Sequence, residues 1–286
     1  MSPELKEQLS SVIGSKIVRV TPISGGDSSA AYRIKITDDQ LFCKYHGGEN
    51  GLPMILAEKD GLNAIRATGT IGTPSVIHAG PCQNGAFLLM EYVESKEATD
   101  SEMAQLGSGL ASLHAVSEDT FGWHSHNFIG SLPQSNTRSH YWHRYYGEQR
   151  LWPQLTMALD KKLLQKEEIP EKEGLITTLA EQLGAPRASL IHGDLWQGNY
   201  LVSASGKPFL IDPSVSFADA GMDLAMTMLF GGFSRSFYDA YGEETGGVPL
   251  HKAQTDLYQL YYLLVHLNLF GGSYATSVRR LLAAYF

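Results

Sequence analysis

The sequence contains the stretch Ile191-His192-Gly193-Asp194-Leu195-Trp196-Gln197-Gly198-Asn199, and Ile211-Asp212-Pro213 follows it. Asp194 lies two residues after His192 and five before Asn199, which is the H-x-D-x-x-x-x-N spacing of a kinase catalytic loop. Phosphoryl transfer needs a carboxylate to receive a hydroxyl proton and oxygen ligands for Mg²⁺. We therefore expect Asp194 to be the catalytic base, and Asn199 and Asp212 to bind Mg²⁺. Either fragment alone is compatible with an ordinary turn or strand end, but the three residues rarely coincide by accident.

A lysine for the phosphates of ATP is expected upstream. Lys44 lies in the apolar run Leu41–Tyr45, and Glu58 lies in a helical stretch 14 residues further on. A strand lysine held by a helix glutamate is the arrangement that kinases use to neutralise the α- and β-phosphates. In isolation, a solvated strand-edge lysine and a surface glutamate would be the better explanation of the pair, and it is the downstream motif that favours the phosphate role.

Two further segments are expected to contact the nucleotide. Gly25, Gly26, Asp27 and Ser28 lie between two predicted strands, where small residues let backbone N–H groups approach phosphate oxygens. The segment is not G-x-G-x-x-G, so a plain hairpin turn is the alternative. A later predicted strand ends in Met90, Glu91, Tyr92 and Val93, whose backbone could receive adenine where the chain crosses between two lobes.

The order of apolar patterns predicts an α+β fold with two lobes. Short apolar runs separated by Gly, Asp and Pro predict antiparallel strands at 16–23, 31–36, 41–45, 75–79 and 86–93. Helical spacing predicts helices at 3–13 and 55–67, and then at 99–116, 141–164, 171–184, 223–229, 234–241 and 253–285, the last broken near Gly271-Gly272. The remaining strands are predicted at 189–192, 200–203 and 208–212. We expect a nucleotide-binding lobe over 1–93 and a larger, mostly helical catalytic and substrate-binding lobe over 94–286.

Composition narrows the class of protein. The 286 residues carry a net charge of −8 and no run of five or more basic residues, so nucleic acid and anionic membranes are not expected partners. The two cysteines, Cys43 and Cys82, are too few for a disulfide scaffold and lack the paired spacing of a zinc site. With no apolar membrane span and no leader pattern, we expect a soluble, cytoplasmic protein.

Beyond these motifs the chain resembles the fructosamine kinase (ketosamine kinase) family, a branch of the protein-kinase-like fold that also contains aminoglycoside and choline kinases. The stretches that carry the resemblance beyond HGDLWQGN and IDP are Ser24–Asp27, Phe121–Trp123, Ile129-Gly130, Gln134–Asn136, Arg150-Leu151, Asp223–Met226 and His266–Gly271. The resemblance implies a bilobal protein-kinase-like fold and an ATP- and Mg²⁺-dependent phosphotransferase with an alcohol group as acceptor. The implied acceptor is a small-molecule or protein-bound ketosamine, a fructosamine or ribulosamine glycation adduct, and the implied role is protein deglycation repair.

The resemblance also suggests a sugar pocket and a supporting residue. The candidate sugar contacts are Trp123, Asn136, Arg150, Trp196 and His266, with core packing the alternative for Trp123 and Arg150. Asp223 is expected to brace the catalytic loop. A second histidine that is frequent in the family's C-terminal motif is Leu269 here, which removes one expected sugar contact.

Other functions remain open at this point. An aminoglycoside- or choline-type phosphotransferase would share the HGD…N motif, whereas a protein kinase is disfavoured because Gly193 replaces the usual arginine and Pro213-Ser214 follow the metal-binding aspartate. A non-catalytic binding module would have lost the base, the metal ligands or the lysine, and none is lost. His124, His126, His140 and His143 could form a zinc site, but no cysteine or paired carboxylate lies nearby in sequence. The oligomeric state is not predicted.

Overall fold

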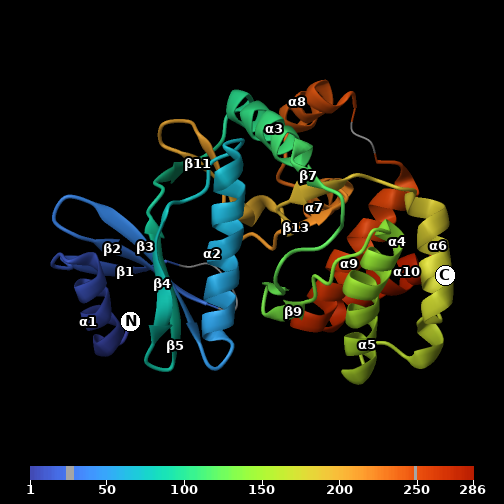
Figure 1. Ribbon diagram of the computed structural model, residues 1–286, viewed down its shortest axis with the longest axis horizontal. Coiled ribbons are helices and arrows are strands. Elements are labelled where there is room, and N and C mark those ends of the chain that lie inside the picture. Colours follow the sequence, from blue (N-terminus) through green and yellow to red (C-terminus); the bar gives the residue numbers. More distant parts are fainter. Residues whose placement is uncertain (24–28, 248–249) are drawn as a thin grey trace.

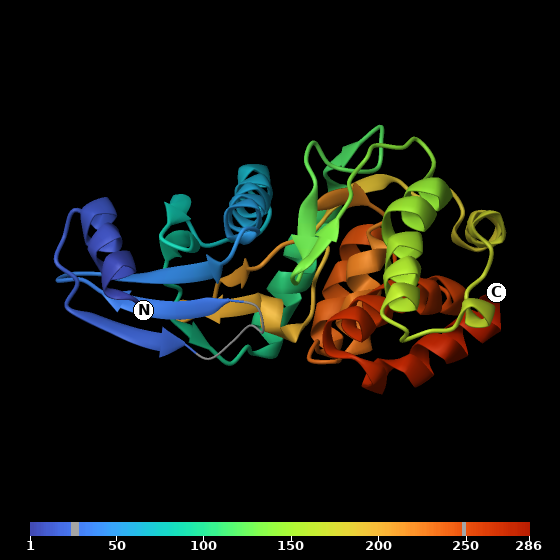
Figure 2. The ribbon, with the colours of Figure 1, turned by 90° about the horizontal axis from the view of Figure 1, so that it is seen from below.

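The computed structural model describes residues 1–23, 29–247 and 250–286 (Figure 1). Gly25, Gly26, Asp27 and Ser28, which the sequence assigns to phosphate binding, lie outside the described residues. The chain forms an N-terminal lobe built on a sheet and a larger C-terminal lobe built mainly of helices, side by side in both views (Figures 1 and 2).

The N-terminal lobe is a five-stranded antiparallel sheet in the order β1-β2-β3-β5-β4, which confirms the predicted sheet. Its strands are β1 (Arg19–Ile23), β2 (Ala30–Lys35), β3 (Gln40–Gly47), β4 (Val76–Cys82) and β5 (Gly85–Glu91). Side chains alternate between the faces of a strand. Leu41 and Cys43 of β3 therefore pack with α1 (Pro3–Ile13), whereas Phe42 lies in the cluster beside α2 (Gly51–Thr68). Lys44 belongs to the same face as Phe42.

Helix α2 covers the face of the sheet that looks toward the C-terminal lobe. Ile55 and Leu62 pack against Leu88 and Met90 of β5, and the helix ends at Gly69 in the left-handed conformation. Glu58 lies on the same buried face. The predicted helix is confirmed, and it begins several residues earlier than the apolar spacing indicated.

The chain crosses between the lobes after β5. The short strand β6 (Ser95–Lys96) already pairs with β11 (Tyr200–Ser203) of the C-terminal lobe. Helix α3 (Asp100–Ala115) follows, capped by Thr99, whose hydroxyl accepts from the Glu102 N–H while the Glu102 carboxylate accepts from the Thr99 N–H. The helix predicted over 99–116 is thus confirmed, with Thr99 as its cap.

The remaining helices surround one large apolar core, and no described helix is long and apolar enough to cross a membrane. They are α4 (Trp142–Tyr146), α5 (Trp152–Asp160), α6 (Lys172–Leu183), α7 (Gly221–Leu229), α8 (Arg235–Thr245), α9 (Lys252–Phe270) and α10 (Ala275–Tyr285). The single helix predicted over 141–164 is wrong in detail, because a π-helical turn, Gly147–Leu151, separates α4 from α5. Pro153 has no N–H to donate to the Gln149 carbonyl, which accepts from Arg150 Nη1 instead.

Three small sheets position the loops of the C-terminal lobe. They contain β10 (Ala188–Ile191), β11 and β12 (Pro208–Leu210), as predicted, and also β7 (Ser117–Glu118), β8 (Asn127–Ile129), β9 (Leu132–Gln134) and β13 (Ser216–Ala218), which the sequence did not reveal. These unpredicted strands span only two or three residues each, too few to show an alternating pattern. Because β13 pairs with β10, the segments on either side of the candidate catalytic residues lie next to one another.

Candidate active site

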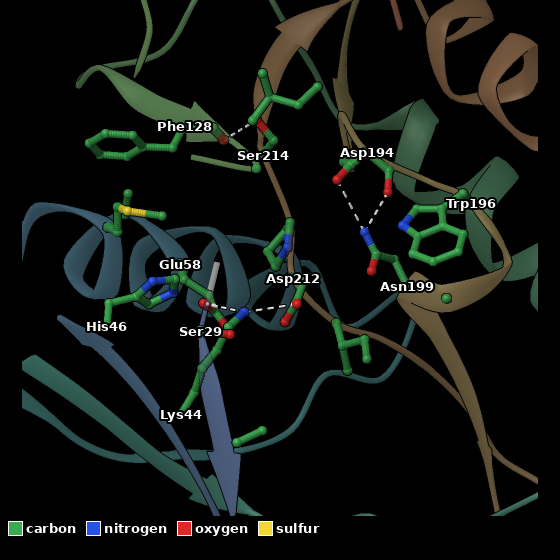
Figure 3. Close-up of a pocket in the computed structure, with 18 of the residues that line it drawn as sticks. Ser29, Lys44, His46, Glu58, Phe128, Asp194, Trp196, Asn199, Asp212 and Ser214 are labelled. Atoms are coloured by element: carbon green, nitrogen blue, oxygen red, sulfur yellow. Dashed lines mark hydrogen bonds and ion pairs between the residues drawn. The ribbon is translucent and has the colours of Figure 1, made fainter. Parts of the chain in front are cut away.

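A cavity of about 770 Å³ opens between the lobes and is lined by residues of both (Figure 3). Lys44, Glu58, Asp194, Asn199 and Asp212 all line it, although they are spread over 169 positions of the chain. The fold thus brings together the five residues that the sequence assigned to phosphoryl transfer.

The loop that carries Asp194 is held from behind by Asp223. The Asp223 carboxylate accepts from the backbone N–H groups of His192, at 2.7 Å, and Gly193, at 2.8 Å, and contacts His114 Nε2 at 3.1 Å. Burial acts to raise the pKa of Asp223, but the hydrogen bond and charge of His114 with the backbone N–H groups hold that pKa below its ordinary value. A buried carboxylate that stays ionised therefore fixes the backbone of the loop.

The side chain of His192 ties the loop to the segment that carries Asp212. His192 Nε2 lies 2.8 Å from the Ile211 carbonyl, and the Asp194 N–H donates to His192 Nδ1. This pattern requires a neutral ring with its proton on Nε2, and burial lowers the His192 pKa in the same sense.

Gly193 is required by a close backbone approach. Its φ is +86°, and a Cβ there would lie 2.1 Å from the Ser214 carbonyl oxygen. The Ser214 N–H in turn donates to the His192 carbonyl at 2.8 Å. Any side chain at Gly193 would separate the two loops that hold Asp194 and Asp212.

Asp194 and Asn199 are joined by hydrogen bonds inside the cavity. Asn199 Nδ2 donates to the Asp194 carbonyl at 2.8 Å and to its carboxylate Oδ2 at 3.3 Å (Figure 3). Burial, followed by the charges of Asp212 and Asp223, raises the pKa of Asp194 to about 7. A carboxylate with such a pKa can accept a proton near neutral pH.

Lys44 lies between two carboxylates. Its Nζ is 2.9 Å from Glu58 Oε2 and 2.8 Å from Asp212 Oδ2 (Figure 3). Burial opposes the charge of Lys44, but Asp212 and Glu58 together raise its pKa above the ordinary value. At Glu58 the effect of burial is larger than that of Lys44, and the Glu58 pKa is raised. At Asp212 the charge and hydrogen bond of Lys44 outweigh burial, and the Asp212 pKa is lowered. The lysine is thus firmly protonated and faces the cavity.

Asn199 and Asp212, the two residues expected to bind Mg²⁺, both line the cavity. Asp212 follows β12 with a φ of +54°, an uncommon conformation for a residue other than glycine, and it turns the carboxylate into the cavity. Because Asn199 Nδ2 is engaged by Asp194, the amide oxygen is the atom left to bind a metal. A carboxylate and an amide oxygen fit Mg²⁺, which binds through few protein ligands and keeps several waters.

The crossing between the lobes contributes the opposite wall. Met90, Glu91, Tyr92 and Val93 line the cavity, as expected for the adenine end. The Glu91 carboxylate accepts from the N–H and hydroxyl of Ser75, which fixes the direction in which the chain leaves β5.

Aromatic side chains form the outer rim of the cavity. Trp196 is 39% exposed, and its ring lies over Gly198, where a Cβ would come within 2.4 Å of the indole. His266 of α9 packs at a tilt against Phe230, at 4.7 Å between ring centroids, and Phe270, at 5.5 Å. His266 Nδ1 donates to the Tyr262 carbonyl, so Nε2 is left as an acceptor in a ring whose pKa burial lowers. Trp196, His266 and Phe270 line the cavity.

Trp123 and Asn136 occupy different positions from those expected of sugar contacts. Neither residue lines the cavity. Trp123 Nε1 donates to Asp60 of α2 at 2.7 Å, and Asn136 is buried with Asn127, Tyr145 and Arg150. The structure therefore gives these two residues supporting positions rather than substrate contacts.

Arg150 is a buried residue of the core, which is the alternative to a sugar contact that the sequence analysis gave for it. It is 1% exposed and donates to Ser135, Asn136, Tyr145 and Ser216, while in the described part of the chain no carboxylate pairs with it. The network continues through Gln134 to Ser214, next to the Asp212 loop. Hydrogen bonds thus connect Arg150 to that loop through Asn136, Asn127 and Gln134.

The zinc interpretation of the histidines finds no support in the geometry. His124 contacts Asp60, and His126 Nδ1 accepts from the Asn136 N–H. Within residues 1–23, 29–247 and 250–286, no group of three or more His, Cys, Asp or Glu side chains could hold a metal ion together.

Several residues that line the cavity were missed by the sequence analysis. His46 lies two positions after Lys44 on the same face of β3, so the alternation of that strand could have revealed it. Ile129, Gly130 and Ser131 form the turn between β8 and β9. The resemblance named Ile129 and Gly130 without assigning them to the site, and strands of three residues are too short for the pattern to predict the turn.

Together the two lobes, the strand lysine with its helix glutamate, and the loop pair of Asp194 and Asp212 define a phosphotransferase of the protein-kinase-like fold. The chain belongs to the fructosamine kinase family, whose model matches residues 1–286. It is a kinase.

Relatives and solved structures agree with this placement. A "probable ketoamine kinase" of Enterococcus faecium is 36% identical over 272 residues, covering 92% of this chain and 94% of the relative. The chloroplastic protein-ribulosamine 3-kinase of Arabidopsis thaliana is 31% identical, covering 94% of this chain and 83% of the relative. A crystal structure assigned as a fructosamine-3-kinase from Thermobifida fusca superposes with a TM-score of 0.87 at 28% identity, covering 100% and 99% of the two chains. A spectinomycin phosphotransferase crystallised with ADP and spectinomycin has a TM-score of 0.63 at 14% identity, covering 100% and 94%, and shares the fold.

Proposed function

We propose that the protein transfers the γ-phosphoryl group of ATP, with Mg²⁺, to a sugar hydroxyl of a ketosamine. The observation that carries the proposal is the position of Lys44 Nζ within 3 Å of both Glu58 and Asp212, in the cavity that also holds Asp194 and Asn199. A protonated lysine, two oxygen donors for a cation and a carboxylate base are the parts that phosphoryl transfer requires.

Each residue has a role in the proposed step. Asp194 orients the acceptor hydroxyl and takes its proton as the hydroxyl oxygen bonds to the γ-phosphorus and the bond from that phosphorus to ADP breaks. Lys44, steadied by Glu58, neutralises the phosphates. Asn199 and Asp212 would hold Mg²⁺, which when bound neutralises charge on the phosphates. Asp223 keeps the backbone around Asp194 in place.

The nucleotide is proposed to lie against β3 and the crossing segment. Met90, Glu91, Tyr92 and Val93 would receive adenine, and Gly25, Gly26, Asp27 and Ser28 remain candidates for phosphate contacts. The boundary proposed at residues 93 and 94 agrees with the pairing of β6 to the C-terminal lobe.

The rim supports a ketosamine as the acceptor. Trp196 offers an apolar ring face to a sugar, and His266 Nε2 offers an acceptor to a hydroxyl. Relatives named for ketoamines and ribulosamines cover most of the chain. By the same likeness we propose a role in the repair of glycation adducts. A cytoplasmic location fits the two free cysteines, Cys43 and Cys82.

The alternative acceptor is an aminoglycoside or choline. A polycationic antibiotic calls for carboxylates around the acceptor, yet the carboxylates among the described lining residues are Glu58, Glu91, Asp194 and Asp212. Three of these belong to the phosphoryl machinery and Glu91 lies at the adenine end. The described residues of the rim add no negative charge, which favours a ketosamine over a polycationic antibiotic.

Release of ADP measured with a panel of acceptors tests the proposal. Fructoselysine, ribuloselysine, choline and an aminoglycoside should be compared at equal concentration, with ATP and Mg²⁺ in excess. We expect turnover with one or both ketosamines. Turnover confined to choline or the aminoglycoside would overturn the proposed acceptor while leaving the phosphoryl site intact.

A further inference from the structure

Helix α2 makes a polar contact with the C-terminal lobe at Asp60. Asp60 Oδ2 accepts from Trp123 Nε1 at 2.7 Å and lies 3.1 Å from His124 Nε2, so one carboxylate oxygen holds two neighbouring rings. In Figures 1 and 2, α2 stands between the sheet and the C-terminal lobe. Asp60 lies two residues after Glu58, about 200° around the helix, so the two carboxylates point in nearly opposite directions.

The partner side of this contact is rigid. Gly122 and Phe217 exchange backbone hydrogen bonds, at 2.9 and 2.8 Å, and the Trp123 N–H donates to the Asn136 carbonyl. The indole of Trp123 packs on Phe217 at 5.5 Å between ring centroids and on His124 at 4.7 Å. Phe217 belongs to β13, which pairs with the strand β10 that leads into Asp194. The position of Trp123 is therefore fixed relative to the candidate base.

A second contact holds the same turn of α2. A Cβ at Gly61 would lie 2.9 Å from Pro213 Cγ and 3.5 Å from Val215 Cγ1, so the helix approaches the segment after Asp212 as closely as a glycine permits. Gly61 limits how near α2 can come. The Asp60 contact supplies attraction with a defined direction, because a hydrogen bond between a charged acceptor and an N–H donor is both strong and oriented.

The position of α2 determines the position of Glu58. Glu58 is buried, and its Oε2 pairs with Lys44, whereas its Oε1 has no hydrogen-bond partner in the described part of the chain. The carboxylate interacts with Lys44 of β3 and lies near Asp212, which both belong to other elements, so its distance from them depends on the position of the helix. A small rotation or shift of α2 would separate Glu58 from Lys44.

We propose that Asp60 and Trp123 are positioning residues that hold α2 against the C-terminal lobe. By fixing the helix they keep Glu58 paired with Lys44, and they keep that pair at the correct distance from Asp194 and Asp212. Neither residue is among the described residues that line the cavity. The inference depends on the proposed phosphate role of Lys44 and Glu58. It assigns the Trp123 of the Phe121–Trp123 motif to the nucleotide side of the reaction, although the sequence resemblance placed it with the sugar.

The test is a double-mutant cycle between Asp60 and Glu58. kcat and the KM values for ATP and fructoselysine are measured for Asp60→Ala, Asp60→Asn, Trp123→Phe, Glu58→Gln and the Asp60→Ala, Glu58→Gln double variant. Asp60→Asn keeps an acceptor oxygen, and Trp123→Phe keeps the ring but removes the N–H donor. Asp239→Ala is the control, because it removes an exposed ion pair with Arg235 on α8.

If Asp60 acts through Glu58, Asp60→Ala and Trp123→Phe each lower kcat/KM for ATP about tenfold. Asp60→Asn and Asp239→Ala stay within about twofold of the wild type, and the KM for fructoselysine is unchanged. In the Glu58→Gln background, Asp60→Ala lowers kcat/KM for ATP by less than about twofold, because the Lys44–Glu58 ion pair that Asp60 supports is already lost.

Three outcomes overturn the inference and can be told apart. A tenfold loss from Asp60→Ala in both backgrounds, or wild-type activity in Asp60→Ala and Trp123→Phe, would show that the contact does not act through Glu58. Wild-type activity in Glu58→Gln would remove the proposed role of Glu58 itself, and the role of Asp60 with it. Thermal unfolding of every variant separates these results from a simple loss of folding.

Discussion

The inner end of the cavity and its outer rim are built on different principles. At the inner end, Lys44, Asp194, Asn199 and Asp212 form ion pairs and hydrogen bonds with one another or with buried neighbours. At the rim, Trp196 and Phe270 are 39% and 48% exposed and contribute ring faces more than hydrogen bonds. The inner residues depend on each other for their charge and position, whereas the rim residues can be exchanged with less effect on their neighbours.

This difference separates the residues that carry out phosphoryl transfer from the residues that contact the acceptor. A solved phosphotransferase with spectinomycin shares the fold at 14% identity, so the fold alone does not select the acceptor. We therefore expect substitutions at the inner end to remove turnover and substitutions at the rim to change which acceptor binds. The predictions below begin with the largest expected effect.

Asp212→Asn should lower kcat about 10³-fold, because an ionised ligand to Mg²⁺ and a partner of Lys44 are lost together. The concentration of Mg²⁺ needed for half-maximal activity should also rise. Mg²⁺ titrations of ADP release at fixed ATP measure both effects. Asp239→Asn, on an exposed ion pair, serves as the control and should leave both quantities unchanged. Normal kcat in Asp212→Asn would place the cation elsewhere.

Trp196→Ala should raise the KM for the ketosamine about tenfold, since a half-exposed ring face is lost at the rim. Trp196→Phe keeps part of that face and should raise the KM about threefold. The KM for ATP should not change in either variant. Initial rates with both substrates varied would check this, and an equal rise in the KM for ATP would contradict the separation of the two ends.

Asp194→Asn should raise the thermal midpoint of the ligand-free protein by a few degrees at pH 8, by less at pH 5, and hardly at all below the unfolded pKa of an aspartate. The folded pKa of Asp194, about 7, lies above its unfolded value, so the folded protein binds the extra proton between those two pKa values. Wild-type stability from this group is thus fully present below the unfolded pKa, and it is lost progressively as the pH rises from there through about 7. Asparagine carries no charge and avoids that loss.

Thermal unfolding of the wild type and Asp194→Asn at a series of pH values measures the effect. Equal midpoints at pH 8 would mean that burial does not disfavour the Asp194 carboxylate.

The sequence was most informative where spacing along the chain translates directly into spacing in the structure. Asp194 and Asn199 are five residues apart within one loop, and the alternation in β3 predicts that Lys44 lies on a strand face. The five strands and the two helices of the N-terminal lobe were predicted for the same reason, because their apolar patterns are long enough to read.

Contacts between distant segments were not predictable in this way. The pairing of Asp60 with Trp123 spans 63 positions and depends on how the lobes pack. The resemblance placed Trp123 among the sugar contacts, because a family motif identifies a residue without its partner. Strands of two or three residues, such as β8 and β13, were missed because their pairing is set by tertiary contacts rather than by pattern.

The inner end of the cavity is tested most directly by turnover in Asp194→Asn, measured together with the affinity for ATP in the presence of Mg²⁺. Loss of the base should lower kcat with a ketosamine by about 10²–10⁴-fold. The dissociation constant for ATP, from calorimetry, should stay within about threefold of the wild type, because Lys44, Glu58 and Asp212 are untouched. Near-normal turnover in Asp194→Asn would contradict the assignment of Asp194 as the base on which the proposed reaction depends.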